Sequence, residues 1–292
     1  MIELWNKNVE KDFFEQSLKI APPEKLFYTT DDNKYLAYWP KGYKGKKSTL
    51  QSRNSIIGSY TEKWVSDIMN QIVAKDDLFA IPSVVCPEIE LTDSSPADVV
   101  ISRKKGKNQR AEDILLIIEV KMSIVWNWQY NKDSTEERLI CLGDYTTHQG
   151  NPGLLRSDSM LKAIGKSINL RVSSDRASQI PILVITNTPI TNYYYNKVDN
   201  IKKAGIVQGF LSVNPKPLES GNESLKYSDG FGFYRFDSFN ELSEYIKSML
   251  ETKIHFFSGM KTTAELGKII EIANREKEYE KKGQIFLNLI RG

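Results

Sequence analysis

Two acidic residues and a lysine in the middle of the chain have the types and spacing of a metal-dependent hydrolytic site. Asp98 opens one β-rich segment, and Glu119 and Lys121 lie near the end of another. Because side chains alternate between the two faces of a strand, Glu119 and Lys121 point the same way, while the apolar residues around them point into the core. Asp98 comes beside them if the two segments pair as a hairpin.

Two carboxylates held close together repel each other and are costly to bury, unless a hard divalent cation with a preference for oxygen lies between them. Mg²⁺ meets that demand. A bound metal polarises a phosphate oxygen and lowers the pKa of a water, and an ammonium beside it orients the attacking hydroxide or neutralises the developing charge. These residues therefore indicate phosphodiester hydrolysis.

The elements that must position these residues are predicted as a helix, three strands, a helix and a strand. Apolar residues recur at threes and fours over residues 52–74, which is typical of an amphipathic helix. A second helix is expected at about 154–171, before the apolar segment 180–186. The three β-rich segments between the helices are residues 83–91, 97–102 and 114–124. We expect an α/β fold with a central mixed sheet flanked by helices.

The remaining segments are interpreted as additions to a single domain spanning residues 1–292. The core is expected at about 52–213, with an N-terminal flank, 1–51, and a C-terminal helical elaboration, 214–292. Further elements are predicted at 9–20, 193–204, 207–213, 239–250 and 263–282. The last helix opens with a capping box formed by Thr262 and Glu265.

Composition excludes several other classes of protein. The fractions of 40% apolar and 26% charged residues are ordinary for a globular chain, and the formal net charge of +3 permits a polyanionic partner without requiring one. No segment is long and apolar enough to cross a membrane, and we expect a cytoplasmic protein. Two cysteines do not make a disulfide framework or a zinc site. His148 and His255 lie too far apart in sequence to suggest a histidine-pair nuclease.

Pro96 and Asp98, followed by Glu119-Val120-Lys121, resemble the signature of the PD-(D/E)xK, or restriction-endonuclease-like, superfamily of nucleases. Ala97 separates the proline from the aspartate, a spacing that the superfamily also uses, and the predicted αβββαβ order is similar to that of its core. The resemblance implies that Asp98 and Glu119 are Mg²⁺ ligands together with the backbone carbonyl of Val120. It also implies that Lys121 is the catalytic lysine.

The superfamily often carries a further glutamate on the helix before the sheet. Glu62 is in the matching position, one turn from the apolar stripe of the predicted helix. The alternative is that Glu62 is an ordinary exposed helix residue, and Glu88 and Glu90 compete for any additional acidic role.

Two segments supply candidates for contact with DNA. Asn and Gln side chains can read adenine edges and Arg can read guanine, and phosphates can be held by basic side chains or by a helix N-terminus. The candidates after the Glu119 strand are Asn127, Gln129, Asn131 and Arg138, and those of the second segment are His148, Gln149, Arg156, Ser159, Lys162 and Lys166. Core packing near Trp126 and Trp128, or a solvated basic helix face, is the alternative.

No nucleotide cofactor is expected. Gly165-Lys166-Ser167 is similar to the end of a phosphate-binding loop, but Met160 stands where that motif requires glycine, and the triplet lies within a predicted helix.

Within the superfamily, the length and the absence of helicase, zinc or methyltransferase motifs make the chain resemble a type II restriction endonuclease. This resemblance implies a prokaryotic protein that acts as a homodimer on double-stranded DNA and leaves 5′-phosphate and 3′-OH ends. One alternative is a repair, recombination or transposition nuclease of the same superfamily. The other is a non-catalytic DNA-binding or scaffold protein, in which Asp98, Glu119 and Lys121 form a surface charge cluster.

Overall fold

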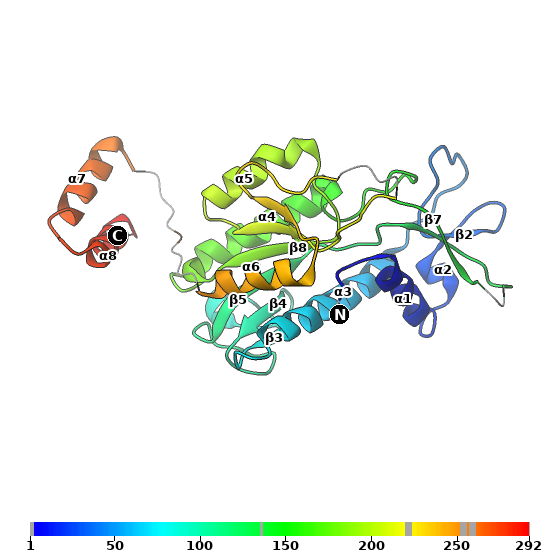
Figure 1. Cartoon of the computed structure of the whole chain (residues 1–292), viewed down its shortest axis with the longest axis horizontal. Coiled ribbons are helices and arrows are strands. Elements are labelled where there is room, and N and C mark those ends of the chain that lie inside the picture. Colours follow the sequence, from blue (N-terminus) through cyan, green and yellow to red (C-terminus); the bar gives the residue numbers. More distant parts are fainter. Residues whose placement is uncertain (1–2, 135–136, 220–223, 252–255, 257–260, 292) are drawn as a thin grey trace. The chain divides into compact units, whose positions relative to one another are not determined.

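The computed structural model describes all residues except 1–2, 135–136, 220–223, 252–255, 257–260 and 292 (Figure 1). The chain divides into two compact units, Met1–Lys253 and Ile254–Gly292. The division falls inside the region 214–292 that the sequence suggests as one helical elaboration. His255 lies outside the described residues. No helix of the described chain is long and apolar enough to span a membrane.

The first unit is built on a six-stranded mixed sheet with the order β10-β9-β8-β5-β4-β3. The strands β3, β4 and β5 pair antiparallel, whereas β5, β8, β9 and β10 run parallel to one another. This confirms the α/β class and the mixed sheet. The strands are Phe79–Val84 (β3), Ala97–Ser102 (β4), Ile114–Val120 (β5), Ile182–Thr186 (β8), Gly209–Ser212 (β9) and Phe233–Arg235 (β10).

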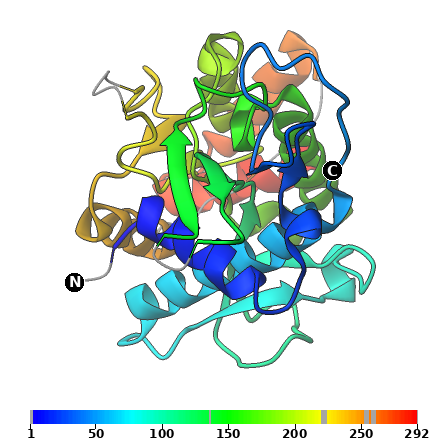
Figure 2. The same ribbon diagram turned by 90° about the vertical axis from the view of Figure 1, so that its right-hand side faces the viewer.

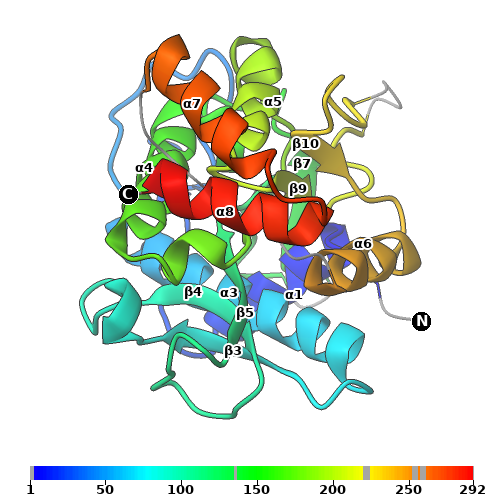
Figure 3. The same ribbon diagram turned by 90° about the vertical axis from the view of Figure 1, so that its left-hand side faces the viewer.

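Helices cover both faces of this sheet (Figure 1). On one face lie α3, Gln51–Val73, and α6, Phe239–Glu251; on the other lie α4, Ser157–Ser173, and α5, Tyr195–Lys203. Alternate residues of β5 explain this layering, because Ile118 packs in the core beneath α3 while Ile117 packs in the core beneath α4. Figure 3 shows β3, β4 and β5 together with α3 and α4, seen from the left-hand side of Figure 1.

A second, four-stranded antiparallel sheet joins the N-terminus to the segment after β5 (Figure 2). Its strands, in order along the sheet, are Tyr28–Thr29 (β1), Tyr35–Leu36 (β2), Asn127–Tyr130 (β6) and Leu139–Gly143 (β7). The helices α1, Lys7–Ser17, and α2, Pro23–Leu26, precede it. The helix predicted over 9–20 is present as α1, and the pairing of β2 with β6, which the sequence did not predict, joins the N-terminal flank to the region after β5.

Glu10 of α1 fixes the link between the two sheets. Its carboxylate is fully buried and accepts hydrogen bonds from the backbone N–H groups of Val125 (2.8 Å) and Trp126 (2.9 Å) and from the indoles of Trp128 (3.0 Å) and Trp5 (3.3 Å). We refer to these five residues as the Glu10 cluster. It ties the N-terminal helix to the segment that follows β5.

The first predicted strand was wrong in position. The structure has β3 at Phe79–Val84, followed by a short 3₁₀ turn at Pro87–Ile89. Pro87 favours the turn, and Glu90, with φ of 60°, is in the left-handed region and cannot continue a strand. The start of β3 is held earlier along the chain, where Asn70 of α3 exchanges two 2.8 Å hydrogen bonds with the backbone of Ala80.

The C-terminal unit also differs from expectation. The predicted helix over 263–282 is two helices, α7 at Thr263–Ala273 and α8 at Tyr279–Arg291. The capping box of Thr262 and Glu265 is confirmed at the start of α7, and Asn274 is the C-cap.

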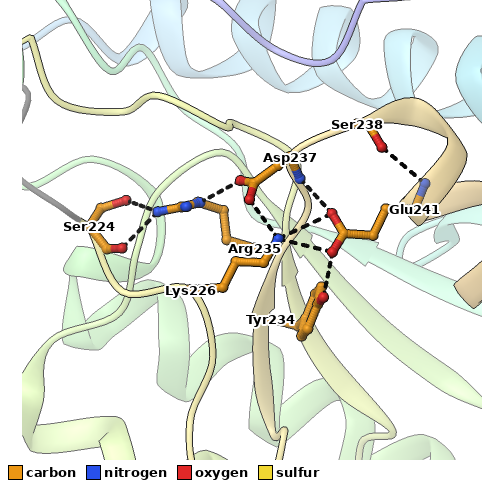
Figure 4. A network of polar contacts seen from close by, with 7 residues as sticks. All are labelled: Ser224, Lys226, Tyr234, Arg235, Asp237, Ser238 and Glu241. Atoms are coloured by element: carbon orange, nitrogen blue, oxygen red, sulfur yellow. Dashed lines mark hydrogen bonds and ion pairs between the residues drawn. The ribbon is translucent and has the colours of Figure 1, made fainter.

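A polar network closes α6 onto the edge strand β10 (Figure 4). The ammonium of Lys226 lies 2.7 Å from a carboxylate oxygen of Asp237 and 2.9 Å from one of Glu241. Glu241 also accepts from the hydroxyl of Tyr234, and Arg235 contacts Asp237 at 3.0 Å. These groups lie at the edge of the sheet opposite to β3 and fix α6 there.

Candidate functional site

The pairing of β4 with β5 brings the three sequence-predicted residues together. The register joins Val99 to Ile118, which places Asp98 opposite Glu119 across the antiparallel ladder. The carboxylate of Asp98 also accepts a 2.8 Å hydrogen bond from the backbone N–H of Val120. Asp98 is therefore held in place by the strand that carries its partners.

Lys121 lies beside both carboxylates. Its ammonium forms an ion pair with Glu119, lies 3.7 Å from the carboxylate of Asp98, and donates to the carbonyl of Val120 at 3.2 Å. The carbonyl oxygen of Val120 thus contacts the same ammonium group as the carboxylate of Glu119.

A second lysine completes the arrangement. Lys166 of α4 lies 3.0 Å from Asp98 Oδ1 and 2.8 Å from Glu119 Oε2, so its ammonium bridges the two acids. Asp98, Glu119, Lys121 and Lys166 are referred to below as the carboxylate–lysine cluster. Glu119 is 5% exposed, whereas the lysines are 20% and 25% exposed, so the carboxylate lies at the bottom and the ammonium groups reach towards solvent.

The sequence pattern of this helix predicts that Leu161, Ile164 and Ile168 share one side, and that Ser159, Lys162 and Lys166 share the other. The structure differs: Leu161 and Ile168 are exposed, Ile164 is half-buried, and the helix packs on the sheet through Met160, Ala163, Ser167 and Leu170. Small side chains at 163 and 167 let the helix approach the strands closely. Lys166, three residues after Ala163, then faces the cluster, and this helical spacing is the signal that would have found it.

Burial and neighbouring charges shift the ionisation of these groups. Burial, followed by the nearby charge of Asp98, raises the pKa of Glu119 above its usual value. Burial alone would lower the pKa of Lys166, but the carboxylates of Glu119 and Asp98 outweigh it, and the pKa is raised. The cluster therefore stabilises a protonated Lys166.

Glu62 lies on α3 near the cluster without joining its ion pairs. The half-buried side chain has no hydrogen bond or ion pair within the described part of the chain. Burial, then the charge of Asp98, raises its pKa to about 7. Of its competitors, Glu88 lies in the 3₁₀ turn and accepts from the backbone N–H of Ala111 at 2.8 Å, and Glu90 is the C-cap of that turn.

The donor set of the cluster fits Mg²⁺. Two carboxylates and the Val120 carbonyl present oxygen atoms, and Mg²⁺ normally takes one or two protein carboxylates and completes its octahedron with water and phosphate oxygens. Within the described residues no group of three or more His, Cys, Asp or Glu side chains is arranged to hold a metal ion. An ion bound to Asp98 and Glu119 together would take the place now held by the Lys166 ammonium, which would have to move.

The candidates at 127–138 lie on the four-stranded sheet rather than beside the cluster. Asn127 is buried, and its side-chain oxygen accepts from the backbone N–H of Tyr38 at 2.9 Å. Gln129 donates to Asn131 at 2.6 Å, and the exposed Arg138 donates to the carbonyl of Ser134 at 3.2 Å. The structure therefore gives Asn127 a packing role, and leaves Gln129, Asn131 and Arg138 at or near the protein surface.

The second group of candidates for contact with DNA also contains both buried and exposed residues. His148 is buried and stacks on Tyr38 with 3.9 Å between ring centroids, and burial lowers its pKa to about 4, so the ring is neutral. Ser159 is half-buried, and Lys162 is exposed and paired with Asp158 at 3.1 Å. Gln149 and Arg156 line a cavity at the N-terminal end of α3.

Comparison with protein-family models, with curated proteins and with solved structures finds no match for this chain.

Proposed function

We propose that this protein is a Mg²⁺-dependent DNA endonuclease with a restriction-endonuclease-like core, and that it acts as a type II restriction enzyme. The observation that carries the proposal is the meeting of Asp98 and Glu119 on paired strands, with the ammonium of Lys121 beside both. The αβββαβ order of α3, β3, β4, β5, α4 and β8 in the first unit supports it, with β6 and β7 of the four-stranded sheet inserted between β5 and α4.

In this proposal, Asp98, Glu119 and the Val120 carbonyl hold the metal. Bound Mg²⁺ supplies positive charge to a phosphate oxygen and acidifies a water. Lys121 neutralises charge that develops on the phosphate and orients the attacking oxygen. Lys166, once displaced from the carboxylates, neutralises a phosphate of the bound strand, and Glu62 accepts a proton or holds a water at the edge of the site.

The products of cleavage test this proposal against its alternatives. Purified protein is incubated with long unmethylated duplex DNA and Mg²⁺. Discrete, reproducible fragments with 5′-phosphate ends support a type II restriction enzyme. Smears or nicks at particular DNA structures support a repair, recombination or transposition nuclease of the same superfamily. No cleavage with Mg²⁺, Mn²⁺ or Co²⁺ supports a non-catalytic DNA-binding protein.

Alanine at Asp98, Glu119 or Lys121 separates a catalytic cluster from a surface charge cluster. Each variant should lose cleavage by orders of magnitude and keep most DNA binding. Lys203→Ala is the control, because this exposed lysine at the end of α5 lies outside the cluster and is not among the candidates for contact with DNA. If the three cluster variants cleave DNA as fast as the control variant, the proposed catalytic role of the cluster is wrong.

The homodimer implied by the family resemblance is also a proposal. Its support is a row of exposed apolar side chains on α4, Leu161, Ile168 and Val172, spaced as one face of a helix. Light scattering on the full chain, with and without Leu161→Lys, tests it: a dimeric mass that falls to the monomer in the variant supports the proposal, and a monomeric wild type contradicts it.

A further inference from the structure

A cavity of about 610 Å³ lies at the N-terminal end of α3, outside the carboxylate–lysine cluster. Its walls come from the aromatic segment around Tyr38 and Trp39, the first turns of α3, the link that follows β5, and the loop 149–151. A volume of this size falls in the range of pockets that enclose a small molecule.

One wall of the cavity is aromatic and carries a buried positive charge. Arg53 is 5% exposed, and its guanidinium carbon lies 5.1 Å from the ring centre of Tyr28 and 5.2 Å from that of Tyr38. One of its nitrogens donates to the carbonyls of Leu26, at 3.2 Å, and Ala37. No carboxylate lies within ion-pair distance of Arg53 in the part of the chain that the structure describes. A buried charge without a counter-charge favours an anionic ligand.

The other lining groups point to the same chemistry. Gln51, Asn54, Gln149 and Asn151 supply side-chain amides, Arg156 supplies a second guanidinium, and no Asp or Glu is among the residues that line the cavity. Amide and guanidinium groups pair with the edges of nucleobases, aromatic rings stack on their faces, and guanidinium groups bind phosphate. The cavity lining therefore offers no carboxylate that could bind a cation.

The cavity is close to the carboxylate–lysine cluster along two elements. Ser123, in its wall, is two residues beyond Lys121, which limits the distance between their Cα atoms to about 7 Å. Ile57, also in its wall, is five residues before Glu62 on α3, a rise of about 7.5 Å along the helix. The hydroxyl of Tyr38 donates to the carbonyl of Ile124 at 2.7 Å, which fixes the aromatic wall to this link.

We infer that this cavity binds a single nucleobase together with its phosphate. The faces of the Tyr38 and Tyr28 rings are in contact with His148, Trp39 and Arg53, so the base packs against the edges of this aromatic wall. Amides contact the edge of the base, and Arg53 and Arg156 neutralise the phosphate. The inference rests on the proposed function in one respect: the base belongs to the strand whose phosphodiester lies at the carboxylate–lysine cluster. In a duplex the base must leave the stack to enter the cavity, at a cost that is lowest where its pairing is already weak.

The first experiment asks whether the cavity takes a nucleotide at all. The four deoxynucleoside monophosphates are titrated into the full chain and followed by saturation-transfer NMR and calorimetry, without a metal ion. Binding of at least one nucleotide is expected, with a dissociation constant of about 0.01 to 1 mM.

A variant that fills the cavity identifies the binding site. Asn54→Trp should weaken nucleotide binding at least about tenfold by occupying the cavity with an indole. Ser55→Trp is the matched control, because this exposed neighbour on α3 lines a different surface depression and not this cavity. Equal weakening by both variants, or by neither, overturns the inference.

The second experiment distinguishes a base swung out of DNA from a free nucleotide. Binding is measured, with Ca²⁺ in place of Mg²⁺, to duplexes in which one abasic position faces an intact base and is moved stepwise along the DNA. A base drawn from the duplex predicts binding about tenfold tighter at one or two positions, lost in Asn54→Trp and kept in Ser55→Trp. Nucleotide binding without this preference supports the cavity and assigns it to a free nucleotide.

Cleavage assays on the same preparations separate this inference from the proposed function. DNA cleavage without nucleotide binding and without a preference for weakened pairs overturns the cavity as a base site and leaves the nuclease. Nucleotide binding that Asn54→Trp abolishes, without any cleavage, supports the cavity and contradicts the nuclease.

Discussion

The Glu10 cluster and the carboxylate–lysine cluster both bury carboxylates, but the groups that contact these carboxylates differ in charge and in flexibility. Glu10 accepts hydrogen bonds from four neutral N–H donors, two of them backbone groups. Asp98 and Glu119 are contacted by the ammonium groups of Lys121 and Lys166, at the ends of long side chains that are partly open to solvent.

This difference in partners separates a structural carboxylate from one that can bind a metal ion. Backbone and indole donors belong to packed elements and cannot move away, so no cation can replace them at Glu10. Flexible lysine side chains can withdraw and leave oxygen atoms free for a metal ion. Burial therefore does not identify a functional acid; the mobility of its partners does. Four predictions test this comparison.

The largest effect is expected on catalysis. Asp98→Asn and Glu119→Gln keep the size of each side chain but remove its charge, and should reduce the rate of DNA cleavage about 10³-fold or more, because the metal loses a ligand. Cleavage rates under single-turnover conditions measure this. Their free energies of unfolding should fall by no more than about 1 kcal/mol, because relief of the repulsion between the carboxylates offsets part of the lost ion pairs with the partly exposed lysines. A strongly destabilised Asp98→Asn would show that the cluster is structural.

The reverse outcome is expected at Glu10. Glu10→Gln presents an NH₂ group to N–H donors, so buried donors lose their acceptor, and the free energy of unfolding should fall by about 3 kcal/mol. Urea unfolding at pH 6 measures it. Exposed Glu15→Gln on the same helix is the control and should change stability by less than about 0.5 kcal/mol. A neutral Glu10→Gln would remove the contrast between the two clusters.

The pH dependence of stability should also report Glu10. Burial outweighs the four donors and raises the pKa of Glu10 to about 7 from its usual 4.5. The folded protein then holds a proton that the unfolded chain releases, so stability contributed by this group is present below pH 4.5 and is lost as the pH rises to about 7. The loss amounts to about 3 kcal/mol.

Comparing wild type with Glu10→Gln isolates this slope, since Glu62 and Glu119 titrate in both proteins. Urea unfolding at pH 5, 6, 7 and 8 should give a difference between them that shrinks as the pH rises. A constant difference would mean that the N–H donors keep Glu10 ionised throughout this range.

The smallest effect is expected at Lys166. In the presence of a chelator, Lys166→Gln leaves Asp98 and Glu119 with one ammonium and should lower stability by about 1 kcal/mol, discounted for partial exposure. Mg²⁺ should raise the melting temperature of this variant more than that of wild type, because one ammonium group fewer competes with the ion for the carboxylates. Lys162→Gln should behave as wild type; an equal response of both variants to Mg²⁺ would place the ion elsewhere.

Strong local patterns in the sequence were enough to predict the central strands. Residues 97–102 were predicted as a strand and form β4 without a shift, and the apolar run before Glu119 forms β5. The proximity of Asp98 and Glu119 was predicted on the condition that the two strands pair as a hairpin, which β4 and β5 do. The long stripe of 52–74 gave α3 within one residue at each end.

The errors arose where tertiary contacts override local pattern. The two-residue strands β1 and β2 carry no signal of their own and exist because β2 pairs with β6, about a third of the chain away. The buried face of α4 was misassigned because Leu161 and Ile168 are more apolar than Ala163 and Ser167, but the smaller residues fit against the sheet. Arg53 carried no sequence signal, since its importance lies in the rings that surround it.

The balance of charges in the carboxylate–lysine cluster has a thermodynamic consequence for the proposed nuclease. The charges of two carboxylates and two ammonium groups sum to zero, so the cluster carries no net charge in the protein alone. Adding a divalent ion leaves a surplus of positive charge, and adding a phosphodiester alone leaves a surplus of negative charge. Each ligand offsets the other, and linkage requires that the ion strengthen the binding of DNA by the same factor by which DNA strengthens the binding of the ion.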